Sequence, residues 1–401
     1  MASSAAEVYL HIGLPKTGTS YLQDRLWKSR DQLSASGVLV PGAKRSAQNL
    51  AAWDLMGRRP RGADRPQVPG SWDALVKEVR DWSGSHAVIS EEFLAFARAG
   101  QVRRAVQAFG PAQVHVVVTL RDLARVLVAA WQQQLAKGQH WTWEEYAAVV
   151  RDPESGPASA GVAFWLRQDA VRVLDTWQVA VPPERIHLVT VPQPGAPREL
   201  LLQRFAAATR LDPAWMAVES PGRGNVSVGT AEAEVLRRLN LALDDRLNER
   251  QYTRVVAYGV RPVLQDRSSS PGMRLPEEQS AWVTARATAM VTALRRRGHH
   301  VVGDLNDLLP VADAAAGRRP DEVDPAELAD AAVAALAAAV EQHAKLWWRF
   351  RDRDHSAAAD GSRLTSSARA AAGRARLSAL RLADRSRLTR RLAIRYLNRS
   401  P

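Results

Sequence analysis

Residues 8–20 read Val-Tyr-Leu-His-Ile-Gly-Leu-Pro-Lys-Thr-Gly-Thr-Ser. An apolar, β-favouring run leads into a turn rich in glycine and threonine, and a helical pattern over residues 19–30 follows. A strand, a turn and a helix start in this order expose backbone N–H groups and the positive end of the helix dipole, which together bind a phosphate-sized anion. The stretch therefore predicts a strand–turn–helix unit with an anion site at the end of its strand.

The position of the lysine decides which kind of anion site this is. A Walker A loop, G-x4-G-K-[ST], would have lysine directly after Gly18, but that position is Thr19. Lys16 stands three residues earlier and would supply the positive charge. In the predicted site the backbone N–H groups of residues 17–20 hold the anion, and the hydroxyls of Thr19 and Ser20 add donors. The alternative is a plain strand-to-helix connection.

The rest of the chain alternates between the same two kinds of element. Apolar, β-branched runs at residues 8–14, 87–89, 114–120 and 186–191 are typical of buried parallel strands. Helical patterns at 19–30, 72–82, 102–109, 124–135 and 164–177 lie between them, and later patterns at 199–209, 231–245, 277–297 and 326–350 are all helical. This alternation predicts an α/β fold: a three-layer parallel sheet with flanking helices and a mainly helical C-terminal part.

The 401 residues divide into two predicted parts. Residues 1–350 form the α/β domain, which is mainly helical from about residue 199 onward. Residues 351–401 form a basic tail rich in arginine and alanine, either flexible or an amphipathic helix, and the tail carries most of the net charge of +13. Such a helix could make weak contact with an anionic membrane surface, but we favour a solvated tail and expect no specific nucleic-acid partner.

The composition excludes several classes of protein and of chemistry. The chain has no cysteine, so disulfides, thiolate metal sites and cysteine nucleophiles are excluded. No apolar run reaches the roughly 18 residues that a membrane span needs, and the segment before the first strand is too short for a signal peptide. We expect a cytoplasmic protein. It shows no HExxH pattern and no clear acidic partner for Mg²⁺, so we expect no metal.

A second basic residue stands at the end of another buried strand. The run Val-Val-Val-Thr-Leu at residues 116–120 is followed by Arg121 and Asp122. Ligand contacts in α/β folds gather at such strand ends, and a guanidinium binds a phosphate through two parallel hydrogen bonds. Arg121 therefore predicts a second phosphate contact. The alternative is that both residues lie at the surface and start a helix that Asp122 caps.

Together these features resemble the bacterial-type sulfotransferases that use 3′-phosphoadenosine 5′-phosphosulfate (PAPS). Further matching patterns are Ser-Glu-Glu-Phe-Leu at 90–94, Thr-Val-Pro at 190–192, Asn-Val-Ser-Val-Gly at 225–229 and Val-Val-Gly-Asp-Leu at 301–305, so the resemblance covers roughly residues 8–310. It implies a P-loop NTPase-like fold and the transfer of a sulfuryl group from PAPS to a hydroxyl or amine, with 3′-phosphoadenosine 5′-phosphate (PAP) as product. The acceptor class stays open among small molecules, glycans and lipids.

The resemblance also implies roles for individual residues. It places Lys16 at the leaving group and Arg121 at the 3′ phosphate. The implied donor-binding residues are Pro15, Lys16, Thr17, Gly18, Thr19 and Ser20 at the 5′ phosphate, Tyr21 against adenine, Arg121, and the late loop Arg223, Gly224 and Asn225 over the 3′ phosphate. In the family a serine follows the 3′-phosphate arginine by eight residues, and here that residue is Ala129. Arg125 or a nearby backbone N–H is the candidate to replace the missing hydroxyl.

The reaction needs a base for the acceptor's proton, and two carboxylates follow the second predicted strand. Adjacent carboxylates in a partly buried site can raise the pKa of one of them toward the working pH. We favour Glu92, which precedes Phe-Leu as the family's glutamate does; Glu91, a histidine, or two plain helix caps are the alternatives. Among the histidines, His115 and His187 are predicted in strands as core or edge residues. His11 is either a core residue or a support for the loop.

Two other functions remain open at this stage. One is a P-loop kinase that transfers phosphate from ATP with Mg²⁺, against which the missing lysine at position 19 counts. The other is a binding protein that keeps the sulfotransferase fold without catalysis, for which Ala129 is the best support. The sequence gives no indication of the oligomeric state.

Overall fold

The computed structural model of the protein describes residues 7–58, 66–197, 199–216, 228–267, 273–311 and 317–356. The chain divides after Ala338 into two compact units. Nothing in the described residues tests the predicted boundary at residue 351, and the predicted tail lies outside them from residue 357 onward. Among the helices of the described residues, none is both long enough and apolar enough to cross a membrane.

The first unit is built on one six-stranded sheet in which every pair of neighbouring strands is parallel. Its strands are β1 (Glu7–His11), β2 (Val38–Leu39), β3 (His86–Ser90), β4 (Gln113–Leu120), β5 (Ile186–Thr190) and β6 (His300–Val302). They lie in the order β2-β3-β1-β4-β5-β6. The four longer strands confirm the predicted parallel sheet, and the short edge strands β2 and β6 extend it.

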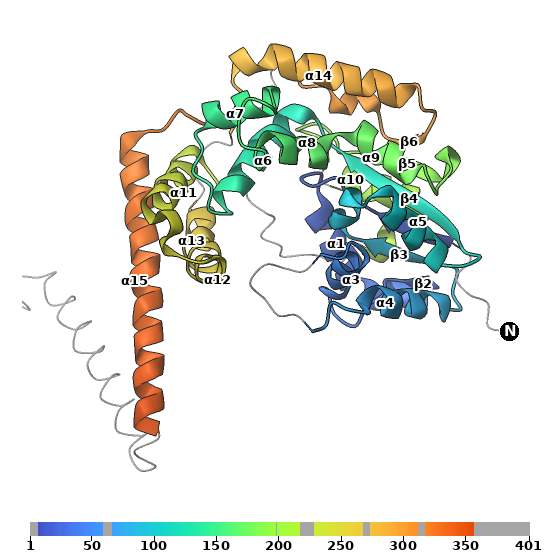
Figure 1. Ribbon diagram of the computed structural model, residues 1–401, viewed down its shortest axis with the longest axis horizontal. Coiled ribbons are helices and arrows are strands. Elements are labelled where there is room, and N and C mark those ends of the chain that lie inside the picture. The colour runs from blue at the N-terminus through green and yellow to red at the C-terminus, as the bar shows by residue number, and fades with distance from the viewer. Residues whose placement is uncertain are drawn as a thin grey trace, which may run out of the picture. The chain divides into compact units, whose positions relative to one another are not determined.

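Helices connect the strands and continue beyond them (Figure 1). They are α1 (Thr19–Lys28), α2 (Arg30–Ala35), α3 (Ala47–Leu55), α4 (Ser71–Arg80), α5 (Ala99–Ala108), α6 (Leu123–Leu135), α7 (Trp143–Arg151), α8 (Gly161–Gln168), α9 (Ala170–Trp177), α10 (Leu200–Thr209), α11 (Thr230–Leu243), α12 (Glu249–Tyr252), α13 (Arg261–Asp266), α14 (Glu277–Arg295) and α15 (Pro325–Ser356). After β5 the described chain is mainly helical, as predicted.

The sheet lies between two layers of helices because successive strand residues face opposite sides. Val8 and Leu10 of β1 pack into a cluster with side chains of α3, α4, α5, α9 and α14. Tyr9, between them, packs on the other side with side chains of α1, α2 and α10. All three side chains are at most 1% exposed. This confirms the three-layer arrangement.

One predicted helix is wrong in its extent. Residues 164–177 form two helices, α8 and α9, with Asp169 between them. The Asp169 side chain accepts a hydrogen bond from the backbone N–H of Arg172 and so caps α9. A capping aspartate needs an extended backbone, which ends the helix before it, so an uninterrupted helix cannot form here.

The strand order determines where a ligand can bind. From β1 the chain turns toward β2 at one edge of the sheet, whereas from β4 it turns toward β5 on the other side. In such sheets ligands bind outside the carboxyl ends of the strands at which the direction reverses. The switch point lies between β1 and β4, so the loop at residues 12–18 and the residue Arg121 both stand at this crevice.

A row of histidines crosses three neighbouring strands. His115 of β4 and His187 of β5 are 2.9 Å apart between Nδ1 and Nε2, and His187 is 2.9 Å from His300 of β6. Burial lowers the pKa of His187 to about 4, and the neighbouring His115 adds to the effect. The two predicted strand histidines are thus half-buried members of the sheet and favour their neutral form.

Acid should therefore destabilise the fold through this row. The unfolded chain binds more protons at His187 between its ordinary pKa of about 6.5 and its folded value of about 4. The contribution of neutral His187 to the stability is complete above pH 6.5 and is lost as the pH falls toward 4. We expect the thermal unfolding midpoint to drop between pH 7.5 and pH 5, and to drop less in His187→Gln. The exposed His140, changed to Gln, is the control; equal drops in both variants and the wild type would contradict this account.

Candidate functional site

The loop after β1 is a tight turn built on left-handed backbone. Gly13, Lys16 and Gly18 have φ angles of 81°, 70° and 86°. Glycine adopts this region without cost, but a residue with a side chain pays roughly 1–2 kcal/mol there. Lys16 keeps the conformation because the surrounding contacts impose it. Such turns let neighbouring N–H groups converge on one point, which is the geometry of an anion site.

Helix α1 begins directly at this turn. Its N-cap is Gly18, and no side chain in the described part of the chain caps the first N–H groups. The first N–H groups of a helix have no acceptor within the helix and carry its positive dipole end. The start of α1 can therefore donate to a bound anion, as the sequence predicts for residues 17–20.

Buried polar side chains hold the loop in place. Thr17 Oγ1 donates to the carbonyl of Leu14 at 2.5 Å and lies 2.6 Å from Thr119 Oγ1. Gln168 Nε2 donates to the carbonyl of Pro15 at 2.9 Å. The hydroxyl of Thr17 thus serves the loop itself, while its backbone N–H belongs to the predicted cradle.

His11 ties this loop to three strands. Its Nδ1 lies 2.7 Å from Ser90 Oγ of β3, and its Nε2 lies 3.1 Å from Thr119 Oγ1 of β4. Complete burial lowers the pKa of His11 to about 3, so the ring is neutral. Because Thr119 also contacts Thr17, His11 supports the loop through Thr119. His11 is therefore both a core residue and a support for the loop, the two roles that the sequence left open.

Arg121 reaches the loop from the end of β4. Its guanidinium donates to the carbonyl of Lys16 at 3.2 Å, and its Nε is buried without a hydrogen-bond partner among the described residues. Burial lowers the pKa of Arg121 to about 10, and the charge of Arg125 adds to this. A positively charged group therefore stands beside the turn with hydrogen-bonding capacity left for a ligand.

The helix that follows Arg121 is capped as the alternative interpretation expected. Asp122 accepts from the backbone N–H of Arg125 at 2.9 Å and also pairs with its side chain. Arg125 donates in addition to the carbonyl of Pro192 at 3.0 Å. With these contacts Arg125 is committed to the protein, which disfavours it as the replacement for the hydroxyl missing at Ala129, a half-buried residue of α6.

The two carboxylates after β3 have different surroundings. Glu91 is 7% exposed and accepts from the backbone N–H of Phe93 at 3.2 Å, so it caps the 3-10 helix η1 (Glu92–Phe96). Burial raises the pKa of Glu91 to about 7, and the charge of Glu92 adds to this. Glu92 is half-buried and accepts from Thr19 Oγ1 at 2.7 Å. Glu91 is thus a buried helix cap, whereas Glu92 is the carboxylate that contacts the loop.

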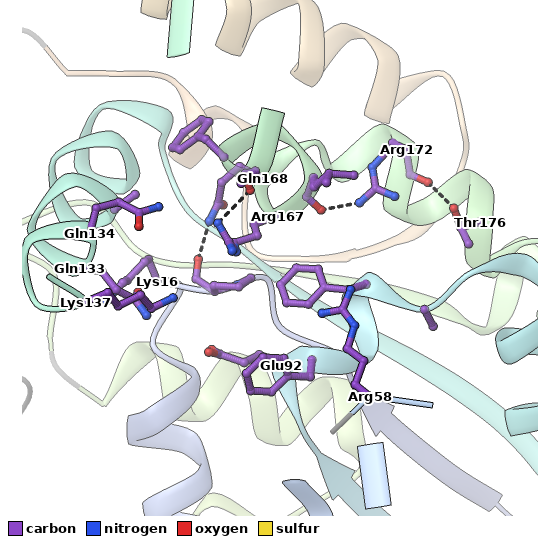
Figure 2. A pocket seen from close by; sticks show the side chains of 18 of the residues that line it. Lys16, Arg58, Glu92, Gln133, Gln134, Lys137, Arg167, Gln168, Arg172 and Thr176 are labelled. Atoms are coloured by element: carbon purple, nitrogen blue, oxygen red, sulfur yellow. Dashed lines mark hydrogen bonds between the residues drawn. The ribbon is translucent and has the colours of Figure 1, made fainter. Parts of the chain in front are cut away.

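A cavity of about 450 Å³ opens beside this loop. Pro15, Lys16 and Glu92 are among the residues that line it. Figure 2 shows Lys16 and Glu92 in the wall of this cavity. Burial lowers the pKa of Lys16 to about 8; the nearby Glu92 opposes this shift, while Arg261, Lys137 and Arg121 add to it. The structure therefore places the predicted leaving-group lysine and the predicted base in the wall of one cavity.

None of the other predicted donor residues in α1 is among the described residues that line the cavity. Ser20 is exposed at the start of α1. Tyr21 is half-buried, packs against the cluster on the α1 and α10 side of the sheet, and has the Arg25 guanidinium 5.3 Å from its ring centre. Arg223, Gly224 and Asn225 lie outside the described residues.

Sequence reasoning missed much of the cavity wall. Arg58 follows α3, Lys137 follows α6, Arg167 and Gln168 belong to α8, and Tyr146 belongs to α7. No motif marks them, because they come from helices far apart in the chain. The one available signal is the stretch at residues 58–70, whose arginine, proline and glycine content predicts a surface loop at the border of a substrate cleft. Its first residue, Arg58, lines the cavity.

The comparisons with known proteins add little. No family model matches the chain, and no curated protein matches it. A solved structure, a sulfotransferase from Alicyclobacillus acidocaldarius, is similar with a TM-score of 0.34 and 12% identity, over 60% of this chain and 94% of that chain. At so low a TM-score the similarity does not assign a function to this chain.

The close approach of the loop to η1 depends on Gly13. A Cβ atom there would lie 3.0 Å from Glu92 Cβ, and φ at Gly13 is +81°. We expect Gly13→Ala to lower the free energy of unfolding by about 1–3 kcal/mol and to move Glu92. Urea denaturation measures this loss.

Gly110→Ala provides the control for the contact. Gly110 also has a positive φ, of 64°, but no atom lies within 4 Å of the added Cβ. It should cost only the backbone strain of about 1–2 kcal/mol. If Gly13→Ala is as stable as Gly110→Ala, the contact between residue 13 and Glu92 is too loose to resist an added methyl group.

Proposed function

We propose that this protein is a sulfotransferase that moves a sulfuryl group from PAPS to a hydroxyl or amine acceptor. One observation carries the proposal: Lys16 belongs both to the left-handed turn at the switch point and, with Glu92, to the wall of the cavity. A donor in the turn and an acceptor in the cavity would then meet at Lys16, which is what transfer between them requires.

The donor side has the charges that a bisphosphorylated nucleotide needs. In our proposal the turn and the start of α1 hold the 5′ phosphate. Arg121 binds the 3′ phosphate with the part of its guanidinium that the protein leaves unused. Tyr21 and the late loop of Arg223, Gly224 and Asn225 complete the donor site, as the resemblance implies.

On the acceptor side, Glu92 is the base. The acceptor oxygen attacks the sulfur of PAPS and forms the new S–O bond, while the S–O bond to the 5′ phosphate breaks and PAP leaves with the electron pair. The acceptor's proton passes to the Glu92 carboxylate, which Thr19 orients through its hydrogen bond. The Lys16 ammonium stabilises the charge that builds on the leaving phosphate. No metal takes part in this scheme.

The first experiment is a calorimetric titration of the protein with PAP, with AMP and with ATP plus Mg²⁺. PAP should bind best. Arg121→Ala should weaken PAP by about 10- to 100-fold, the value of a lost charged hydrogen bond, and leave AMP unchanged because AMP has no 3′ phosphate. Equal weakening of both would mean that Arg121 acts only by supporting the Lys16 carbonyl. Tighter binding of ATP with Mg²⁺ would favour the kinase.

The second experiment measures transfer from PAPS to a panel of hydroxyl and amine acceptors. Lys16→Ala should lower turnover by about 10²–10³-fold and Glu92→Gln by about 10²–10⁴-fold, with PAP binding retained. Lys77→Ala, an exposed lysine of α4, and Glu91→Gln, the buried cap, are the matched controls. Transfer that survives in both site variants would contradict the roles. PAP binding without any transfer would favour the non-catalytic binding protein.

A further inference from the structure

The cavity contains more positive charge than the proposed transfer uses. Six of its described lining residues are basic and one is acidic: Lys16, Arg58, Arg98, Lys137, Arg167 and Arg172 against Glu92. The donor accounts for Lys16. Among the described lining residues, Glu92 is the one acidic side chain that could balance the other five cations. Figure 2 shows that the cations are spread around the cavity, with Arg172 on the side away from Lys16.

Two of these cations, Lys137 and Arg167, interact electrostatically with Glu92. Arg167 is also among the charges that act on Lys137. In the described residues, neither makes an ion pair with a carboxylate; Arg167 donates only to the backbone carbonyl of Ala163, at 3.0 Å. Loss of hydration lowers the pKa of both groups, although the Lys137 side chain stays partly exposed to solvent. The charge of Arg167 adds to the shift of Lys137, and the charge of Arg58 adds to that of Arg167. An anion bound between them would relieve this repulsion.

A buried hydroxyl in the same wall also lacks a partner. Tyr146 of α7 is 1% exposed, and its hydroxyl has no hydrogen-bond partner among the described residues. An unsatisfied buried hydroxyl costs about 1–3 kcal/mol. Tyr146 lines the cavity and interacts with the charge of Arg167. A ligand oxygen near Arg167 could accept its hydrogen bond.

The rest of the wall suits an apolar or aromatic body. Phe93, Phe96 and Phe164 line the cavity, and the Arg167 guanidinium stands 6.0 Å from the ring centre of Phe96. A volume of about 450 Å³ is that of a pocket for a small molecule rather than an extended chain.

We infer that the acceptor is a small molecule with an aromatic or apolar body and an anionic group, which Arg167, Lys137 and the Tyr146 hydroxyl bind. The transfer itself rests on the proposed function; the anion site does not. Three features of the described residues line the same cavity: cations that make no ion pair there, a buried hydroxyl that has no hydrogen-bond partner there, and aromatic side chains. The cations select the acceptor by its anionic group. The hydroxyl or amine of the acceptor then faces Glu92 and Lys16.

The test compares matched pairs of anionic and neutral probes by calorimetry, with and without saturating PAP. The pairs are 4-hydroxyphenylacetate with 4-hydroxyphenylacetamide, and 4-hydroxybenzenesulfonate with 4-hydroxybenzenesulfonamide. The anionic member should bind about 10-fold tighter or more. This preference should disappear in Arg167→Gln and Lys137→Gln, return in Arg167→Lys, and fall in Tyr146→Phe. Arg80→Gln, at the exposed end of α4, is the control for net charge.

The outcomes separate the two proposals. An anion preference that needs Arg167 and Lys137 in a protein that does not bind PAP would support the cavity site and overturn the donor assignment. PAP binding and transfer with no preference in either pair would overturn the inference and leave the sulfotransferase. A preference that survives in both glutamine variants would also overturn it, because the anion would then bind elsewhere.

Discussion

The site depends on a chain of buried hydrogen bonds that begins at a neutral imidazole. Ser90, His11, Thr119 and Thr17 join the ends of β3, β1 and β4 to the loop that follows β1. Both ring nitrogens of His11 lie within hydrogen-bond distance of a hydroxyl, and these two contacts fix the orientation of the ring. The left-handed backbone of Lys16 is strained in itself and persists because this network fixes its neighbours.

The positive charges of the site fall into two groups, one at the turn and one at the cavity. Arg121 and the start of α1 stand on the side of the turn, where the proposed donor phosphates bind. Lys137 and Arg167 stand on the side of the cavity. Lys16 lies between the two groups with Glu92 nearby. In the two complexes that we propose, an anionic ligand at each group would reduce the repulsion among these like charges.

The sequence predicted the sheet well because its four longer strands are buried on both faces and appear as continuous apolar runs. It could not predict β2, whose two residues are too short to show a pattern. It also predicted Lys16 and Glu92 as site residues after two of these strands, and the structure pairs the two strands and places both residues in the wall of one cavity. It could not identify Arg167, because arginine is abundant along the chain and only packing decides which guanidinium is buried. Asp169, in contrast, shows a capping pattern that could have been recognised.

The perturbed lysine has a consequence for chemical labelling. Because burial lowers the pKa of Lys16 to about 8, more of its side chain is an unprotonated amine near neutral pH than in an ordinary lysine, which is almost wholly protonated there. A neutral amine is a nucleophile, and the chain contains no cysteine to compete with it. Mild acylating reagents should therefore modify Lys16 ahead of the exposed lysines, and a ligand that fills the site should protect it. The protein thus contains an intrinsic reporter of occupancy.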